Sequence, residues 1–383
     1  MTNLDRKSCE LLRSVVRIAP EAPTQQIQVL AESISDWDSV LGLAKEHGVS
    51  QLLFAHLEKI ENHVPHSALE RLRKENSRNV FHSLTNSAEL IGVLQELTQE
   101  NIPAMPFKGV VLGASVYSAP AIRPAGDLDI LIYYRDLVRA TAILVKRGYE
   151  LKTSANPDGS PAVSDYYEYH FERESDGMVI ELRWRLELTQ PRFRRDLGMD
   201  WVWPGRRTVI LAGAEVPDMD PAIALLVLCM HGSKHVWTRL IWISDVAQEI
   251  VAFPDLDWKV VTREAKRVGL WRALALGVLL AQRIADAPVP QDTLHRFEAD
   301  ATARRLARHI DEHLFDAPGS TPKSRVPYNL QLLGLQDRLR LIFSLSFLRP
   351  NDRDRASINL PKPLHPLYFL IRPFRLLRDK SSR

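Results

Sequence analysis

Two aspartates separated by one residue are the side chains of this sequence best suited to chemistry. Asp127 and Asp129 stand in residues 126–133, a segment that is otherwise mostly apolar. On an extended strand alternate side chains share a face, so both carboxylates would lie on one side, about 7 Å apart along the backbone. Because they repel each other unless a cation lies between them, the pattern predicts a site for a hard divalent ion such as Mg²⁺. The alternative is a turn aspartate followed by a solvated one at a sheet edge.

A third acid interrupts another apolar segment. Glu181 lies in residues 178–186, which also read as a strand. If this strand pairs with residues 126–133, Glu181 would complete a three-carboxylate cluster able to hold Mg²⁺ against phosphates. An ion pair between Glu181 and Arg183 or Arg185 is an equally good interpretation of the strand alone.

Three residues upstream of the aspartates could bind phosphate. Lys108 and Gly109 precede a predicted helix, where glycine permits close backbone approach and free amides attract anions. Arg123 lies four residues before Asp127 and could clamp phosphate oxygens, although a loop arginine is more often a surface group. The same residues could also form an ordinary turn.

Two histidines four residues apart raise the question of zinc. His231 and His235 would share one helix face, and Asp245 could join them. The helix lacks the glutamate of a His-Glu-x-x-His motif. We therefore favour histidines that pack under the sheet or line a cleft between the helices and the strands.

The hydrophobic periodicity predicts an α+β fold with a small mixed sheet flanked by helical regions. We expect an N-terminal helical region at 1–101, a core at 102–216 and a helical bundle with a basic tail at 217–383. Ser67 and Glu70 have capping-box spacing and should open a long helix. The expected strands are 104–108, 126–133, 150–153, 166–173 and 178–186, and the later helices are 221–231, 239–253, 258–268, 270–284, 291–314 and 330–347.

Composition indicates a reduced, cytoplasmic protein. The chain has 45% hydrophobic and 25% charged residues, two cysteines, and no apolar leader or run long enough to span a bilayer. The net charge of +3 arises from the tail at 361–383, so a broad nucleic-acid-binding face is not expected. Peripheral membrane contact through this tail is possible, but a docked last helix is favoured.

Several motifs in order resemble the bacterial nucleotidyltransferase-like family of the DNA polymerase beta superfamily. The resemblance begins with Phe107-Lys108-Gly109, Leu112, Tyr117, Arg123 and Asp127-Leu128-Asp129. Residues 180–184 look like the family's Glu-Leu-His-Trp strand, with Arg183 in place of its histidine. Residues 230–237, with Arg239, Trp242 and Asp245, are similar to its helical signature. The similarity covers roughly residues 80–250.

The resemblance implies a Mg²⁺-dependent nucleotidyltransferase, with Mn²⁺ as a possible substitute. It implies that Asp127, Asp129 and Glu181 hold the metal and act in catalysis, while Lys108, Gly109 and Arg123 bind the phosphates of an NTP. The acceptor would be a hydroxyl of a small molecule, sugar, peptide or protein. The main alternative is a non-catalytic nucleotide- or metal-binding regulatory module of the same fold, and a membrane-peripheral protein is the third.

Overall fold

The structure is a computed structural model, and the helices and strands named below lie between Arg6 and His313. It describes residues 6–17, 23–117, 119–124, 126–152, 167–186, 197–316, 328, 331 and 332. The predicted loop at 154–164 and the basic tail at 361–383 lie outside the described residues. So does nearly all of the predicted helix at 330–347.

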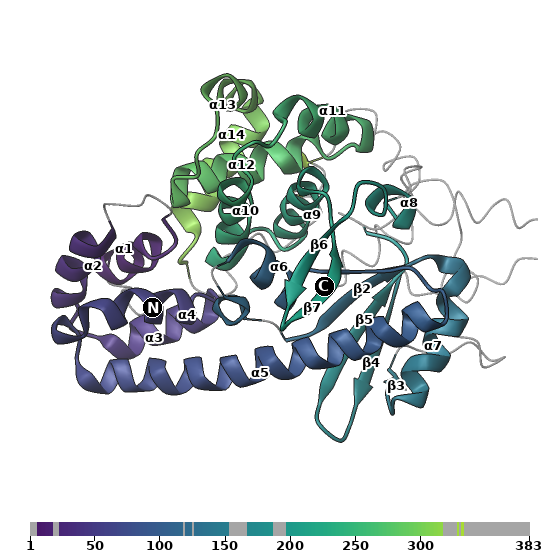
Figure 1. The fold of residues 1–383 in the computed structure, drawn as a ribbon. Coiled ribbons are helices and arrows are strands. Elements are labelled where there is room, and N and C mark those ends of the chain that lie inside the picture. The colour runs from purple at the N-terminus through teal and green to yellow at the C-terminus, as the bar shows by residue number, and fades with distance from the viewer. Residues whose placement is uncertain are drawn as a thin grey trace, which may run out of the picture. The chain divides into compact units, whose positions relative to one another are not determined.

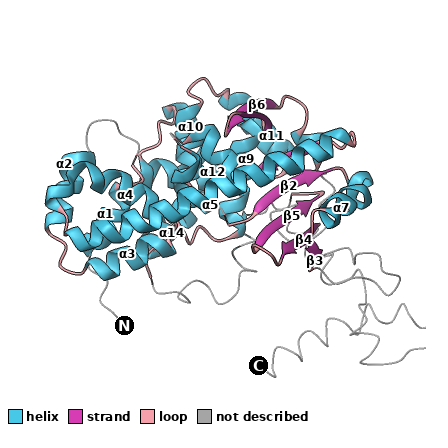
Figure 2. Ribbon diagram, turned by 60° about the horizontal axis from the view of Figure 1, so that its bottom comes forward, coloured by secondary structure: helices cyan, strands magenta, loops and turns pink. Residues whose placement is uncertain are grey.

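The N-terminal region is helical, as predicted. It contains α1 (Arg6–Ser14), α2 (Pro23–Glu32), α3 (Trp37–Glu46), α4 (Ser50–Leu57), a 3-10 turn η1 (Glu58–His63) and the long helix α5 (His66–Gln99). Figures 1 and 2 show α5 running from the N-terminal helices along the sheet. The predicted capping box is wrong, because α5 already begins at His66 behind Pro65 and receives no side-chain cap. Glu70 instead forms an ion pair with Arg73.

A five-stranded mixed sheet follows, which confirms the predicted fold class. Its strands are β1 (Ala104–Phe107), β2 (Leu128–Ile132), β3 (Glu150–Leu151), β4 (Glu168–Arg173) and β5 (Met178–Arg183), in the order β1-β2-β5-β4-β3. Strands β2 and β5 are parallel, while the other neighbours are antiparallel. Helices α6 (Gly109–Val116) and α7 (Leu137–Lys146) follow β1 and β2, respectively, and a short 3-10 turn (Tyr134–Asp136) precedes α7.

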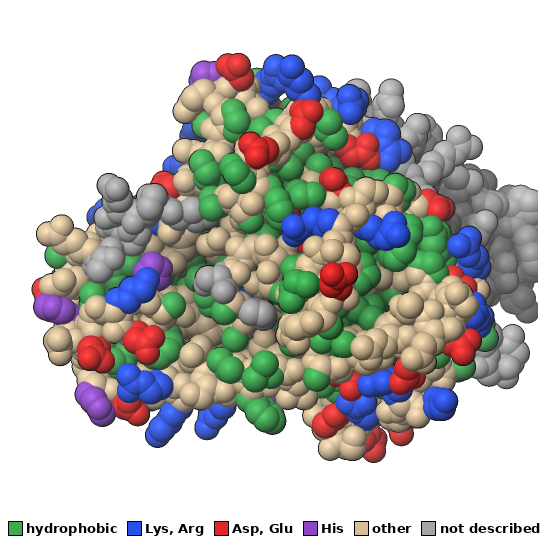
Figure 3. Space-filling view, viewed as in Figure 1, with side chains coloured by type: hydrophobic (Ala, Val, Ile, Leu, Met, Phe, Trp, Pro, Cys, Tyr) green, Lys and Arg blue, Asp and Glu red, His purple; other side chains and the backbone are tan. Residues whose placement is uncertain are grey.

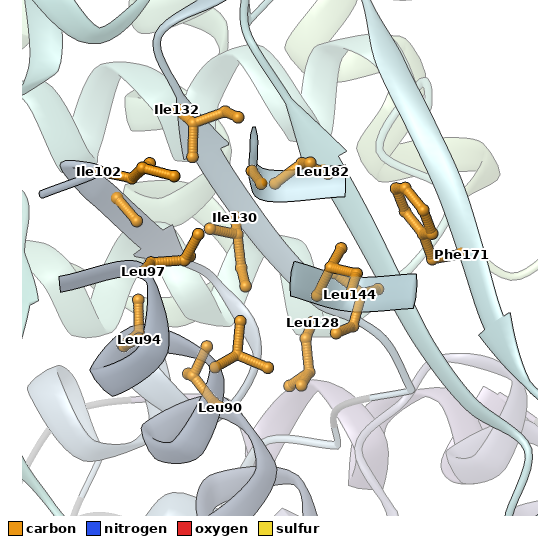
Figure 4. Close-up of a cluster of buried hydrophobic side chains, with 14 of the residues drawn as sticks. Leu90, Leu94, Leu97, Ile102, Leu128, Ile130, Ile132, Leu144, Phe171 and Leu182 are labelled. Atoms are coloured by element: carbon orange, nitrogen blue, oxygen red, sulfur yellow. The ribbon is translucent and has the colours of Figure 1, made fainter. Parts of the chain in front are cut away.

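One face of β2 builds the core, as its alternation predicts. Leu128, Ile130 and Ile132 are at most 2% exposed and pack with side chains of α5, α7 and β5 (Figure 4). Full burial of such a side chain stabilises the fold by about 1.5–3 kcal/mol. Because side chains alternate along a strand, this anchoring turns Asp129 toward the opposite face. The core therefore fixes the direction of the acidic site.

Along the chain, a hairpin that the sequence analysis did not identify lies between the sheet and the later helices. It comprises β6 (Arg207–Leu211) and β7 (Ala214–Asp218), and it follows the short helix α8 (Met199–Val202). The turn residues Ala212 and Gly213 both have positive φ, at 47° and 85°. A two-residue turn of this kind normally contains Asn-Gly or Asp-Gly. Because alanine stands at the first position here, the usual sequence signal for a hairpin is absent.

The C-terminal bundle contains six helices among the described residues. They are α9 (Pro221–Lys234), α10 (Leu240–Ala252), α11 (Trp258–Val268), α12 (Trp271–Ala285), α13 (Gln291–Glu298) and α14 (Ala301–His313). The single helix predicted at 291–314 is two helices, because the Asp300 carboxylate accepts hydrogen bonds from the Thr302 and Ala303 amides and starts a new helix. None of the helices in the described ranges is both long and apolar enough to cross a bilayer.

Candidate metal and phosphate site

The two aspartates and Glu181 converge, as their strand positions predict. In the parallel pairing of β2 and β5, Asp129 lies opposite Glu181, and Asp127 immediately precedes β2. One carboxylate oxygen from each of the three residues lies within 4.8 Å of the others. This group of oxygen donors matches the preference of Mg²⁺ or Mn²⁺.

Glu181 also forms the ion pair that the sequence left open as its alternative. The Arg183 guanidinium contacts Glu181 through one terminal nitrogen and Glu168 through the other. Its Nε donates to Asp129 Oδ1 at 3.0 Å. Both interpretations of Glu181 are therefore true together: it belongs to the cluster, and it is paired with Arg183.

Arg183 is held at the centre of these carboxylates. Its side chain is 11% exposed. Although burial works against the charge, Asp129, Glu181 and Glu168 raise the pKa of Arg183 above its ordinary value. The sequence analysis missed Glu168, because Glu168 and Glu172 share the polar face of β4 and the alternation does not indicate which of them reaches the site.

Lys108 reaches the same cluster from the end of β1. Its Nζ lies 3.3 Å from Asp129 Oδ2, and its side chain is 12% exposed. The backbone of Lys108 has φ 59° and ψ −151°, a conformation that costs a residue other than glycine about 1–3 kcal/mol. Gly109 follows with φ 47° and begins α6. This strained turn directs both Lys108 and the first amides of α6 toward the cavity.

The ionisation of the aspartates differs because their surroundings differ. Burial raises the pKa of Asp127, and the charges of Asp129 and Glu181 raise it further. Burial opposes the charge of Asp129 as well, but Lys108 and Arg183 together hold the pKa of Asp129 below its usual value. Asp129 is thus the carboxylate whose charge the protein already balances, while Asp127 experiences net repulsion.

Arg123 lies at the wall of the cavity with its guanidinium in a buried ion pair. Its Nε lies 3.0 and 3.1 Å from the two carboxylate oxygens of Asp245, and a terminal nitrogen lies 3.1 Å from Oδ2. The Tyr117 hydroxyl donates to the same carboxylate at 2.9 Å. Asp245 therefore pairs with Arg123 rather than with the two histidines. The phosphate-binding role of Arg123 stays a prediction, and its observed contacts tie the segment before Asp127 to α10.

The acidic cluster opens into a cavity of about 960 Å³. Its walls come from the N-terminal helices, the sheet and the C-terminal helices, and they are rich in cations. The cationic side chains lining it are Lys45, Arg78, Lys108, Arg123, Arg183, Lys234 and Arg239. On the outer face seen in Figure 3, by contrast, Lys and Arg side chains are interspersed with Asp and Glu. Outside the three-carboxylate cluster the charged lining is thus mainly basic, with these seven cations against Glu75 and Glu168.

His231 and His235 line this cavity, which was one of the two favoured alternatives. Their rings are 4.7 Å apart, and each lies beside Trp242, at 5.6 and 5.0 Å. Burial lowers the pKa of His231 well below its ordinary value, and the charge of Lys108 adds to the effect. At neutral pH the uncharged His231 ring can therefore donate or accept a hydrogen bond in the cavity, but it adds no positive charge.

The chain is similar in sequence to one family of proteins and in structure to a solved protein. A family model described as an uncharacterised nucleotidyltransferase matches residues 33–286, which is more than half of the chain. No curated protein matches the sequence. The chain is similar to the crystal structure of an antigenic nucleotidyltransferase-like protein from Paracoccidioides brasiliensis, with 17% identity, a TM-score of 0.30, and coverage of 50% of this chain and 91% of that one.

Proposed function

We propose that this chain, which belongs to the uncharacterised nucleotidyltransferase family, moves a nucleoside monophosphate from an NTP to a hydroxyl acceptor with the help of Mg²⁺. One observation supports this reaction more than any other: the oxygens of Asp127, Asp129 and Glu181 lie within 4.8 Å of one another at a cavity with basic walls. Acids without such walls would attract cations, and basic walls without acids would bind phosphate alone. The combination suits a metal–triphosphate complex. Membership of the DNA polymerase beta superfamily, a bacterial source and a cytoplasmic location are parts of the proposal.

The donor set fits a magnesium ion. Three carboxylates supply only oxygen ligands. Burial raises the pKa of Asp127 and repulsion from Asp129 and Glu181 raises it further, which supports a cation between the three acids. Asp127, Asp129 and Glu181 would hold the ion, and Mn²⁺ could replace it. When bound, the ion would draw charge from the phosphate oxygens and orient the triphosphate.

The phosphate chain would lie against the cations of the cavity. Lys108 and the backbone amide of Gly109 face it from the start of α6, where the helix dipole favours an anion. Lys234 and Arg239 line the same cavity from the end of α9 and the start of α10. These groups would balance negative charge that develops on the α-phosphate and on the leaving pyrophosphate.

The transfer itself needs a base and an in-line attack. The acceptor hydroxyl oxygen would form a bond to the α-phosphorus while the bond from that phosphorus to the β-phosphate oxygen breaks, releasing pyrophosphate. We assign the hydroxyl proton to the carboxylate of Glu181, which has an oxygen in the cluster. The acceptor can be a small molecule, sugar, peptide or protein.

The direct test uses each of the four NTPs labelled at the α-phosphate, with Mg²⁺ and a cell extract as the source of acceptors. We expect wild-type protein to bind one or more NTPs and transfer label, and Asp129→Asn to lose transfer. Asp136→Asn is the matched control, since Asp136 is also buried but belongs to an ion pair with Arg139 outside the cavity. Absence of Mg²⁺-dependent NTP binding by the wild type would overturn the proposal.

A second function is favoured by the Glu181–Arg183 ion pair. A glutamate whose carboxylate is already held by a guanidinium is less free to receive a hydroxyl proton, which suits a regulatory module that binds nucleotide or metal without turnover. The labelled-NTP experiment separates the two functions. Retained label without released pyrophosphate would identify the binding module, whereas labelled acceptor together with pyrophosphate would identify the enzyme.

A further inference from the structure

We propose that Arg183 takes the place of a second divalent cation, so that the acidic site binds one metal ion and not two. The inference rests on the proposed function, because it concerns how that site holds charge. Sites with two metal ions keep them about 3.5–4 Å apart and use shared carboxylates to bind both. Here the Arg183 guanidinium already contacts Asp129 and Glu181, two of the three carboxylates that a second ion would need.

Asp129 is the carboxylate that two ions would have to share. Its Oδ1 accepts from Arg183 Nε at 3.0 Å, and its Oδ2 lies 3.3 Å from Lys108 Nζ. Each oxygen of Asp129 thus already contacts one cation of the protein, and its remaining lone pairs serve the single metal ion that it would share with Asp127 and Glu181. Arg183 also contacts Glu181, so it bridges two of the three cluster acids as a metal ion would.

The charges of the site agree with a single ion. Four carboxylates, Asp127, Asp129, Glu168 and Glu181, and the two cations that pair with them, Lys108 and Arg183, carry a formal charge of −2. The charge of Lys234 also acts on Glu168 and Glu181 from the cavity wall. One divalent ion is enough to balance that formal charge, and a second would leave an excess of at least two positive charges for the bound phosphates to offset. Asp129 is only 6% exposed, and repulsion between cations is strong where little water screens it.

The position of Arg183 on β5 keeps its guanidinium among the carboxylates of the site. Arg183 follows Glu181 by two residues on β5, so both side chains share a face, and it lies opposite Glu168 in the antiparallel pairing with β4. An arginine stays charged at all physiological pH values, and its fork of N–H donors matches several carboxylates at once. Glu168 is outside the 4.8 Å group and serves to hold the guanidinium in place.

The test counts metal ions in the full chain with Mn²⁺ and inorganic triphosphate, which offers the phosphates without a base or a transferable group. Two Mn²⁺ ions about 4 Å apart give a spin-coupled electron paramagnetic resonance spectrum, whereas one ion gives an uncoupled spectrum. We expect one uncoupled ion per chain for the wild type and for Arg183→Lys, which keeps the charge. Arg183→Gln should bind two ions and give the coupled spectrum.

Arg173→Gln is the matched control and should behave as the wild type. It removes the same charge from the neighbouring strand β4, where Arg173 pairs with Glu89 and Asp176 away from the cavity. Circular dichroism would verify that each variant is folded. A coupled pair in the wild type, a single uncoupled ion in Arg183→Gln, or no bound Mn²⁺ in the wild type would each overturn the inference. Failure of nucleotidyl transfer would appear in the labelled-NTP experiment instead, with the metal count unchanged.

Discussion

Asp129 and Glu181 lie directly opposite each other in the parallel pairing of β2 and β5, although 52 positions separate 129 from 181 in the chain. In parallel strands paired residues point to the same face, so the pairing brings both carboxylates to the cavity. Leu128 pairs with Ile180 on the opposite face, inside the core. The register that buries these apolar side chains therefore also assembles the acidic site, and a shift of one residue would destroy both.

Glu181→Gln should lower the rate of nucleotidyl transfer much more than it lowers stability. Loss of a positioned general base typically costs a factor of about 10²–10⁴ in rate. We expect a loss of this order for kcat, together with a rise in KM for the NTP, because Glu181 would also hold the ion that orients the triphosphate. Pyrophosphate release under steady-state conditions measures both constants.

The control for that variant is Glu172→Gln on the neighbouring strand β4. Glu172 lies opposite Val179 in the β4–β5 pairing and does not line the cavity. Its replacement should leave kcat unchanged. Equal activity of Glu181→Gln and the wild type would assign the proton to another group.

Asp245→Asn should destabilise the protein strongly. Asp245 is 1% exposed and binds the Arg123 guanidinium at 3.0–3.1 Å, so the substitution leaves a buried positive charge without its counter-ion. Removing one member of a buried ion pair typically costs about 3–5 kcal/mol. Urea unfolding followed by circular dichroism measures the change in the free energy of unfolding.

A surface ion pair provides the comparison for Asp245. Asp38 pairs with Arg71, but its side chain is 81% exposed. Asp38→Asn should therefore leave the urea midpoint unchanged. If both variants unfold at the same urea concentration as the wild type, the Arg123–Asp245 pair does not stabilise the fold.

The sequence analysis predicted those site residues whose neighbours along the chain indicate that the side chain is buried. Asp129 and Glu181 were identifiable because each interrupts an apolar strand, where an unpaired carboxylate is costly. Arg123 and Asp245 lie 122 positions apart, and no local pattern indicates such a pair. Glu168 was missed because it lies on the polar face of β4, opposite the buried Tyr169 and Phe171, where an acid is expected to be solvated. The start of α5 was predicted wrongly since Pro65 fixed the helix entry ahead of the Ser67 signal.

The stability of the protein should fall as the pH drops from about 6.5 toward 4, partly because of His47. Burial lowers the pKa of His47 to about 4, and the charge of Arg239 contributes. Its Nδ1 accepts a hydrogen bond from the Leu240 amide at 3.3 Å, which requires an unprotonated Nδ1. The unfolded chain, with an ordinary histidine pKa near 6.5, takes up a proton first. This stabilisation is complete above about pH 6.5 and is lost as the pH falls through the folded pKa.

The contribution of His47 can be isolated with His47→Asn, which keeps an acceptor for the Leu240 amide but does not titrate. The pKa difference corresponds to about 3 kcal/mol over the full range. Urea unfolding at several pH values should show a shallower decline for the variant than for the wild type. Parallel declines would show that His47 titrates normally in the folded protein.

Gly232→Ala should destabilise the bundle that forms the wall of the cavity. A Cβ atom at Gly232 on α9 would overlap ring carbons of Trp237, whose side chain is fully buried and has no space to retreat. Overpacking of this kind typically costs about 1–3 kcal/mol. Gly42→Ala is the matched control, because Gly42 also lies within a helix but a Cβ atom there would meet no neighbour within 4 Å. Since alanine is the better helix former, Gly42→Ala should raise the thermal unfolding midpoint while Gly232→Ala lowers it. Equal midpoints for the two variants would mean that the Trp237 ring does not pack against α9 as described.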